Sequence, residues 1–437
     1  MRKISVYIIL CAMLAASQSW AQEKSRLTLD EAVKLSLENS FNIKITTQSR
    51  DIAKVYNNPG TAGILPSLTL NAGYGGSVNN IDQRFSNGLQ VQQNGVANNS
   101  TNANAAVNWV FFDGLRMVYA KKRLALQENM SEITVKDSVQ SVMSAVMVTY
   151  YKIIVAQKQL LTLSELIKVS EERLGIAEAK FKTGSADKTL VLQSRLDLNA
   201  QKSLQREQQF EIQKLKMSLN LLMGREPVLD FEPTGEVPMG ATLSYELLRN
   251  EMLKNNPVRL LSEALITHTS YQQKELQARQ YPWLSLNAGY GYNLSRNQAG
   301  FALYNQNLGF TYGVNLSYPL FGGYTLRPQL NAMKIERKIA EQQRDFTTLR
   351  LESRLRQAYA EYEMAIDLWK LEESNEAPAR ENMEIAMARF RVGTTDQLTL
   401  RVAQQSYLEA VTRYQNALIR VKLTELQLLR LGGMLVK

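Results

Sequence analysis

Four short segments of the chain alternate between apolar and polar residues with a period of two. Such alternation predicts β-strands of about ten residues, which is the length a tilted strand needs to cross a bilayer. The apolar positions are Leu68, Leu70, Ala72 and Tyr74; Ala105, Val107, Trp109 and Phe111; Leu284, Leu286, Ala288, Tyr290 and Tyr292; and Phe310, Tyr312, Val314, Leu316 and Tyr318. A small soluble antiparallel sheet is the alternative interpretation of the same pattern.

Most of the remaining chain has the apolar spacing of a helix. Between about 114 and 182 there is no proline, and Gly114 and Gly175 are the only glycines. One apolar stripe there has a mean spacing of about 3.6, so the segment predicts a nearly continuous helix of about 70 residues, roughly 100 Å long. Shorter helices are expected near 28–57 and 187–223, packed along the two halves of the long one.

The sequence is duplicated, because matching blocks recur in the same order at an offset of about 216 and later about 209 residues. Matching blocks include Leu65–Gly75 with Tyr281–Gly291, Phe112–Gly114 with Phe321–Gly323, and Ala179–Gly184 with Ala388–Gly393. Each half predicts helix, strand, loop, strand, helix, turn and helix. In both turns a glycine that favours the left-handed helix end, Gly184 or Gly393, precedes an aspartate that can cap the next helix.

The duplication divides the chain as follows. Repeat 1 is expected over 22–224, with a strand hairpin at about 66–112 and a turn at 184. A linker covers 225–242. Repeat 2 covers 243–433, with a hairpin at about 282–321 and a turn at 393, and 434–437 forms a short tail.

Residues 1–21 have the pattern of a secretory signal peptide. Two positive residues, Arg2 and Lys3, precede an apolar run, and Ala21 ends a small-x-small cleavage site. The only cysteine, Cys11, lies in that run. The chain is therefore expected to be exported, and the mature protein would have no thiol for a disulfide or for catalysis.

Charge and motifs exclude several classes of function. The formal net charge is +10, but basic and acidic residues alternate along the helices, which indicates solvated faces rather than a nucleic-acid surface. The one histidine, His268, has no nearby candidate metal ligands, and the sequence contains no phosphate-binding loop or nucleophile elbow. We expect no enzymatic activity, cofactor, metal or nucleic-acid partner.

Four strands cannot close a barrel by themselves, and an open sheet edge is not tolerated in lipid. Several copies of the chain would have to supply the missing neighbours. Two copies would leave a lumen filled with side chains, whereas three would leave room for a pore. A trimer is therefore preferred.

These features resemble the TolC-like outer-membrane efflux proteins across about 26–433. The resemblance depends on the order and duplication of a Leu-x-x-x-Glu-Ala start, a Leu-Pro-x-Leu strand start, Phe-x-Gly after the hairpin and Ala-x-Phe-x-x-Gly at the helical turn. It implies a mainly α fold with transmembrane β-strands. It also implies a homotrimer with a twelve-stranded barrel in the outer membrane and a periplasmic α-helical barrel. Such channels work with a periplasmic adaptor (membrane fusion protein) and an inner-membrane transporter.

The resemblance also implies candidate functional residues. The adaptor would contact the helical tips, which are Lys182, Thr183, Gly184, Ser185, Arg391, Val392, Gly393 and Thr394. Arg380 and Glu384 would lie near the periplasmic gate, where Met387 replaces a second acidic residue of the family. Pro378 is expected to kink its helix. Trp109, Tyr281, Trp283 and Tyr318 lie at strand ends, where aromatic rings favour the membrane interface.

The expected function is a passive outer-membrane channel subunit, gated at its periplasmic tip, that exports small molecules or proteins in a tripartite system. The rival hypothesis is a periplasmic coiled-coil structural protein or adhesin without channel activity, in which the strands merely pack at one end. The sequence does not identify the cargo, because selection lies in the transporter.

Overall fold

The computed structural model describes residues 25–239, 243–300 and 302–435. The predicted signal peptide and Cys11 lie outside these residues. The described chain forms two compact units. The helical unit contains the residues up to Thr47, Thr134–Arg259 and those from Thr348 onward, and the strand unit contains Gln48–Ile133 and Leu260–Thr347.

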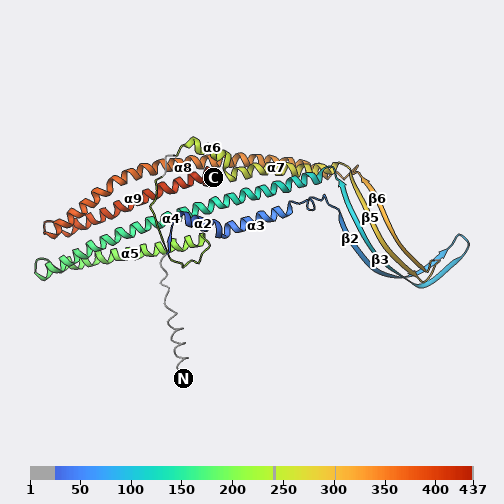
Figure 1. Ribbon diagram of the computed structural model, residues 1–437, viewed down its shortest axis with the longest axis horizontal. Coiled ribbons are helices and arrows are strands. Elements are labelled where there is room, and N and C mark those ends of the chain that lie inside the picture. Colours follow the sequence, from blue (N-terminus) through green and yellow to red (C-terminus); the bar gives the residue numbers. More distant parts are fainter. Residues whose placement is uncertain (1–24, 240–242, 301, 436–437) are drawn as a thin grey trace, which may run out of the picture. The chain divides into compact units, whose positions relative to one another are not determined.

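The strand unit contains one four-stranded antiparallel sheet in the order β2-β3-β5-β6 (Figure 1). Its strands are β2 (Ser67–Arg84), β3 (Gln90–Phe112), β5 (Trp283–Asn297) and β6 (Tyr304–Ser317). The register aligns the apolar positions across the sheet: Val107 pairs with both Leu68 and Ala288, and Ala288 pairs in turn with Tyr312. The predicted apolar residues therefore share one face of one sheet, except that Phe111 falls at a register shift and Phe112 pairs with Leu284 in its place.

The strands are longer than the sequence pattern predicted. They contain 18, 23, 15 and 14 residues instead of about ten. The additional length of β2 and β3 is rich in Asn, Gln and Ser and stays paired from Ser77 to Asn98, apart from one register shift between Asn79 and Ile81. Backbone hydrogen bonds between strands need no apolar alternation, so the pattern underestimated the length.

The same backbone turn connects sheet to helix in both repeats. Gly114 and Leu115 both have positive φ, of 67° and 72°. Gly323 and Tyr324 repeat this with 63° and 57°. A left-handed conformation at Leu115 or Tyr324 costs ~1–3 kcal/mol, so the surrounding structure must impose it. A Cβ at Gly114 would lie 2.6 Å from the Ala278 carbonyl oxygen and from Tyr281 Cβ, so only glycine fits there.

Two long helices follow these turns, α4 (Arg116–Lys182, 67 residues) and α8 (Leu326–Arg391, 66 residues). The helices that precede the strands are α3 (Phe41–Tyr56) and α7 (Pro257–Gln277), the latter followed by the short η1 (Ala278–Gln280). Of the described helices, α4 alone contains a window that is long and apolar enough to cross a membrane, and 56% of that window is buried inside the protein. Burial on this scale is typical of a core helix.

The helical unit is built from two antiparallel helix pairs. The distal part of α4 pairs with α5 (Lys188–Leu222), and that of α8 pairs with α9 (Gln397–Leu431) (Figure 1). Its largest apolar cluster includes Val146, Tyr150 and Ile153 of α4 together with Leu219 and Phe231. The Tyr150 hydroxyl contacts the carbonyl oxygens of Leu27 and Thr234, both at 2.7 Å.

Those two carbonyls lie at the ends of two short parallel strands, β1 (Ser25–Leu27) and β4 (Phe231–Pro233). The sequence did not predict this pairing. Three residues are too few to show a period. The segment 225–242 that was expected to be only a linker therefore contributes a strand to the helical unit, with Phe231 fully buried.

The helix expected over 28–57 is in fact two helices, α2 (Leu29–Asn39) and α3, with a break at Ser40, whose ψ is 125°. Repeat 2 breaks at the equivalent Asn256, between α6 (Tyr245–Asn255) and α7. At each break, the backbone packs closely against a glycine that follows the last helix of the same repeat. A Cβ at Gly224 would lie 2.6 Å from the Asn39 carbonyl oxygen, and one at Gly433 would lie 2.8 Å from that of Asn255.

Candidate functional site

The turns α4–α5 and α8–α9 share one geometry. Gly184 and Gly393 have φ of 73° and 79°. In each turn the next residue closes the helix end: Ser185 N donates to the Lys180 carbonyl at 2.8 Å, and Thr394 N donates to that of Arg389 at 3.0 Å. This hydrogen-bond pattern is the Schellman motif, which requires a left-handed residue at the glycine position.

An aspartate then starts each returning helix. The Asp187 side chain accepts from the backbone N–H groups of Thr189 and Leu190, and Asp396 accepts from that of Thr399 at 2.7 Å. Hydrogen bonds from the Thr189 hydroxyl and from backbone N–H groups lower the pKa of the Asp187 carboxyl group. The hydrogen bond from the Thr399 N–H group lowers that of Asp396 in the same way. The two tips thus have well-defined backbones and carry a negative charge just beyond the turn.

The eight predicted tip residues are all exposed. Beside them, an open groove of about 640 Å³ runs between the first turns of α5 and α9. Its walls include Leu190, Leu398 and Arg401, and Asp187 and Asp396 lie on its rim. The groove combines two apolar side chains with charges of both signs, which is a suitable surface for another helix.

The two helix pairs are linked near these tips. Arg391, at the end of α8, donates from Nε and Nη2 to the two carboxylate oxygens of Glu172 on α4, at 2.5 and 2.8 Å. The hydrogen bond from Arg391 lowers the pKa of the Glu172 carboxyl group. Alongside, Lys180 Nζ lies 4.9 Å from the centroid of the Phe390 ring. The sequence predicted Arg391 as an adaptor contact and did not anticipate its link to Glu172.

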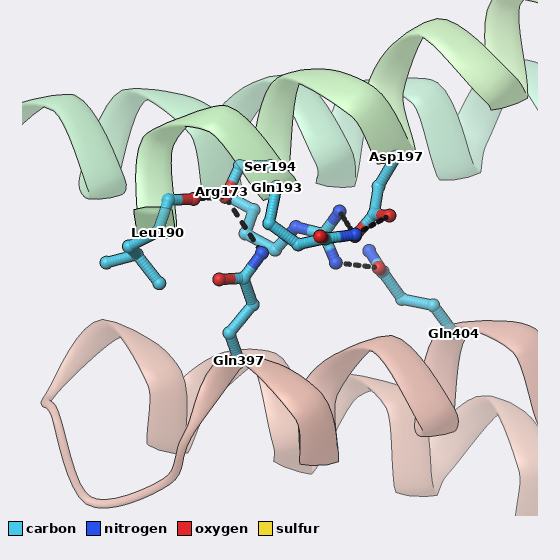
Figure 2. A network of polar contacts seen from close by, with 7 residues as sticks. All are labelled: Arg173, Leu190, Gln193, Ser194, Asp197, Gln397 and Gln404. Carbon is cyan, nitrogen blue, oxygen red and sulfur yellow. Dashed lines mark hydrogen bonds and ion pairs between the residues drawn. The ribbon is translucent and has the colours of Figure 1, made fainter. Parts of the chain in front are cut away.

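A buried polar network lies one residue further along α4 (Figure 2). Arg173 is fully buried; its Nη2 donates to Asp197 of α5 at 2.8 Å, and its Nη1 donates to the side-chain oxygen of Gln404 of α9 at 3.1 Å. Gln397 of α9 donates to the Ser194 hydroxyl of α5 at 3.2 Å. One guanidinium group therefore joins three helices, and Figure 2 shows it lying between them.

Burial affects the pKa of the Arg173 guanidinium group. Loss of solvent lowers the pKa of Arg173, while Asp197 opposes that change. Arginine nevertheless stays protonated, because its ordinary pKa lies far above physiological pH. Nε of Arg173 and Nε2 of Gln404 have no hydrogen-bond partner among the described residues. The network is therefore only partly satisfied, and such a network is sensitive to small displacements of its helices.

The candidate gate residues lie on α8. Arg380 and Glu384 are exposed, and Arg380 lies 3.9 Å from the carboxylates of both Glu165 and Glu376 and 5.2 Å from the Tyr407 ring centroid. Met387 is buried with Phe390 and Leu400, so this position belongs to the core between helices and not to an exposed ring. Pro378 lies inside α8, which continues to Arg391.

The aromatic residues expected at the membrane interface lie at strand ends in the strand unit. Trp109, Tyr281, Trp283 and Tyr318 are all exposed. Trp109 also donates its indole N–H to the Ile64 carbonyl at 2.9 Å. An exposed ring with a bonded polar group suits the boundary between lipid and water.

No cluster of residues that could hold a metal ion occurs in the part of the chain that the structure describes. His268 is half-buried on α7, and loss of solvent, with Arg123 nearby, lowers its pKa.

Sequence reasoning missed Glu172 and Arg173. A signal for Arg173 was present: Ser170, Arg173 and Ala177 continue the apolar stripe of α4 at helical spacing, and all three are fully buried. A lone arginine among small residues at core positions predicts a buried polar contact.

Comparisons with known proteins agree with this architecture. The sequence matches the family model described as outer membrane efflux protein over residues 32–225 and 248–434. A comparison with curated proteins finds no match.

Among solved structures, the CmeC outer membrane channel of Campylobacter jejuni is similar, with a TM-score of 0.79 and 16% identity, covering 93% of this chain and 85% of that one. VceC of Vibrio cholerae gives 0.74 and 17%, covering 93% and 96%. The open state of the MtrE channel of Neisseria gonorrhoeae gives 0.69 and 16%, covering 93% and 89%. At these identities the structures establish the fold alone.

The family match covers both repeats and confirms the expected fold class and channel function. It decides against the periplasmic scaffold or adhesin as an alternative. The chain therefore belongs to the outer membrane efflux protein family: it is a non-enzymatic outer-membrane channel with a periplasmic helical extension, of the kind that forms trimers in tripartite efflux systems.

Proposed function

We propose that this chain is the passive outer-membrane duct of one tripartite pump and that its helical tips both open the duct and receive a periplasmic adaptor. An inner-membrane transporter would supply the energy. The observation that carries the proposal is that the tips combine a well-defined backbone, full exposure and contacts between the two helix pairs. An exposed, charged end suits contact with a partner, and a contact between helix pairs can limit their separation.

The adaptor would contact the eight exposed tip residues and the groove between α5 and α9. Support comes from the charges there: Arg391, Lys182 and Arg401 are basic, and Asp187 and Asp396 are acidic. Complementary charges at an interface steer association and fix its orientation.

Opening would require α8 and α9 to move away from α4 and α5. The contacts to be broken include two exposed ion pairs, Arg391 with Glu172 and Arg380 with Glu165, and the buried hydrogen bond from Arg173 to Gln404. Exposed ion pairs individually stabilise a protein by only ~0–1 kcal/mol. Adaptor binding could replace the ion pairs at little cost, so the main resistance to opening would come from the buried contacts.

Closure of the barrel would use three chains with four strands each. Strands β2 and β6 are the edges of the sheet, and both are exposed. In lipid an unpaired edge is not tolerated, so each edge would pair with that of a neighbouring chain.

The proposal is tested by reversing one charge at each tip. Lys182→Glu combined with Arg391→Glu is expected to abolish co-purification of the adaptor from the native cell envelope, while trimers and barrel remain. Lys202→Glu, away from the tip on α5, provides the control. If the tip variant retains the adaptor as the wild type does, the assignment of the tips is wrong.

A further inference from the structure

The strand unit contains a second groove whose charge is not balanced. It has a volume of about 770 Å³ and lies at the turn after β3, between the first turns of α4 and α8 and the end of α7. Phe112, Leu115, Tyr119, Tyr281 and Leu330 supply apolar or aromatic walls, and Lys274 and Lys334 line it as well. Among the described residues that line it, none is acidic.

A neighbouring groove formed by the same three helices is different. That groove, of about 720 Å³, contains Arg116, Arg123 and Arg279 together with Glu275 and Glu336. Arg123 is paired with Glu275 at 2.6 Å, and Arg116 with Asp113 at 3.1 Å. Two of its three arginines are thus paired with carboxylates of the protein, and the groove itself contains two acidic residues.

The lysines of the first groove have no such partners. Neither Lys274 nor Lys334 lies within 4.0 Å of a carboxylate of the described chain, and both are exposed. Lys274 Nζ lies 5.4 Å from the Tyr119 ring centroid, and Lys122 lies 5.8 Å from the same ring. Two ammonium groups thus line an apolar groove without an acidic residue in its lining, and their flexible stems can reach over its rim.

The backbone holds an apolar side chain at this groove. Leu115 adopts φ of 72° and is 51% exposed, although the left-handed conformation is unfavourable for leucine. Close packing of Gly114 against Ala278 and Tyr281 fixes the turn. The strained backbone therefore presents apolar surface outward beside two unpaired cations.

The site lies where strands meet helices and is lined by Tyr281, which the sequence predicts to lie at the membrane interface. Because the strands of such a channel lie in the outer membrane and its helices extend into the periplasm, we expect this junction to lie near the inner leaflet, which consists of phospholipid. Basic pockets beside apolar surface are the usual binding sites for anionic lipid headgroups.

We propose that this groove binds an anionic glycerophospholipid of the inner leaflet. Lys274 and Lys334 contact the headgroup phosphate, and Leu115, Leu330 and Phe112 contact the start of the acyl chains. This inference rests on the membrane placement of the strands and goes beyond the gating proposed for the tips.

Native mass spectrometry of the detergent-solubilised full-length trimer provides the test, with phosphatidylglycerol as the probe. We expect up to one retained lipid per chain and at least tenfold weaker retention of phosphatidylcholine. Lys274→Gln with Lys334→Gln should weaken phosphatidylglycerol binding about tenfold, and the pair of Lys→Arg variants should restore it. Lys254→Gln with Lys370→Gln removes the same charge from exposed positions of the helical unit and should change binding less than twofold.

Three results would overturn the proposal. The Gln double variant could bind phosphatidylglycerol as the wild type does, or both lipids could bind equally. Inorganic phosphate or glycerol phosphate could displace the lipid at millimolar concentration, which would indicate a free phosphate site. Conductance recorded on the same preparation separates these failures from a failure of the duct itself, because a conducting trimer without retained lipid contradicts only the lipid site.

Discussion

Helices α5 and α9 end the two repeats and have the same length of 35 residues, but they differ greatly in how many of their residues are buried within one chain. Fifteen residues of α9 are buried, against five of α5. Exposed leucines of α5 occupy positions where α9 carries exposed polar residues, at the offset of 209. The pairs are Leu192 with Arg401, Leu196 with Gln405, Leu204 with Arg413 and Leu221 with Arg430.

The difference shows that the duplication did not give the two helices equal environments. Apart from Leu398 and Val402 near the tip, the exposed face of α9 is polar and suits water, whereas that of α5 carries apolar residues along its length and is not covered within one chain. A large exposed apolar face usually marks an interface. Since the family forms trimers, we expect the α5 face to pack on a neighbouring chain.

The polar contacts differ as well. Arg173 of repeat 1 is buried and bonded, whereas its equivalent in repeat 2, Asn382, is exposed. The buried arginine contact between the helix pairs is therefore supplied by repeat 1 and has no equivalent from repeat 2. If the two tips had to act identically, both repeats would be expected to carry this buried contact, and they do not.

The largest expected effect comes from placing a charge on the uncovered face. Leu196→Glu should abolish the trimer, because a carboxylate would be buried at an apolar interface. The matched control is Gln405→Glu at the equivalent exposed position of α9, which should leave the trimer intact. Unheated gel electrophoresis and light scattering in detergent measure the oligomer. Equal behaviour of the two variants would contradict the comparison.

The next effect concerns the buried network. Arg173→Ala leaves Asp197 without its cation and should destabilise the helical unit by about 3 kcal/mol, at the low end for a broken buried pair because Asp197 is partly solvated. Arg173→Met, which fills the volume, with Asp197→Asn should recover most of the loss. Chemical unfolding followed by circular dichroism measures both. A loss below ~1 kcal/mol for Arg173→Ala would show that the network is not structural.

A smaller effect is expected at the link between helix pairs. Arg391→Gln should raise the open-channel conductance or the fraction of time spent open, because Glu172 is released. Arg413→Gln provides the control, since it breaks a comparable pair within one helix pair, Arg413 with Glu372 at 3.1 Å. Single-channel recording distinguishes them, and the charge swap of Arg391 with Glu172 should restore closure.

The same link predicts a dependence on pH. The pKa of Glu172 is lowered in the folded protein, so the contact is fully present above the ordinary glutamate pKa of about 4.3 and is lost as the pH falls through the lower folded value. Gating should thus be constant at neutral pH and change only under more acidic conditions. Glu172→Gln should remove the acid-induced change, and an unchanged acid response in this variant would assign it to another group.

The smallest expected effect is that of Pro378. Replacing it by Ala restores one backbone donor in α8 and should stiffen the helix, which would reduce conductance slightly. Recordings identical to those of the wild type would remove Pro378 from the gate.

The sequence predicted the repeats, the long helices, both tips and the shared apolar face of the strands, because each has a period or a turn signal. It missed the break at Ser40, since no glycine or proline marks it. Pro257 in the second repeat was the available signal, as it begins α7 one residue after the equivalent break. The partners of Arg391 and Arg173 lie on other helices, and Glu172, the partner of Arg391, is more than 200 residues away in the sequence. No local pattern identifies such contacts.

If several copies of this chain together form a conducting duct, the purified, detergent-extracted protein should conduct ions in planar bilayers. We expect single-channel recording to show discrete openings that disappear when Leu196→Glu prevents assembly and persist in Gln405→Glu. A wild-type protein that remains monomeric in detergent and passes no ions would contradict this expectation.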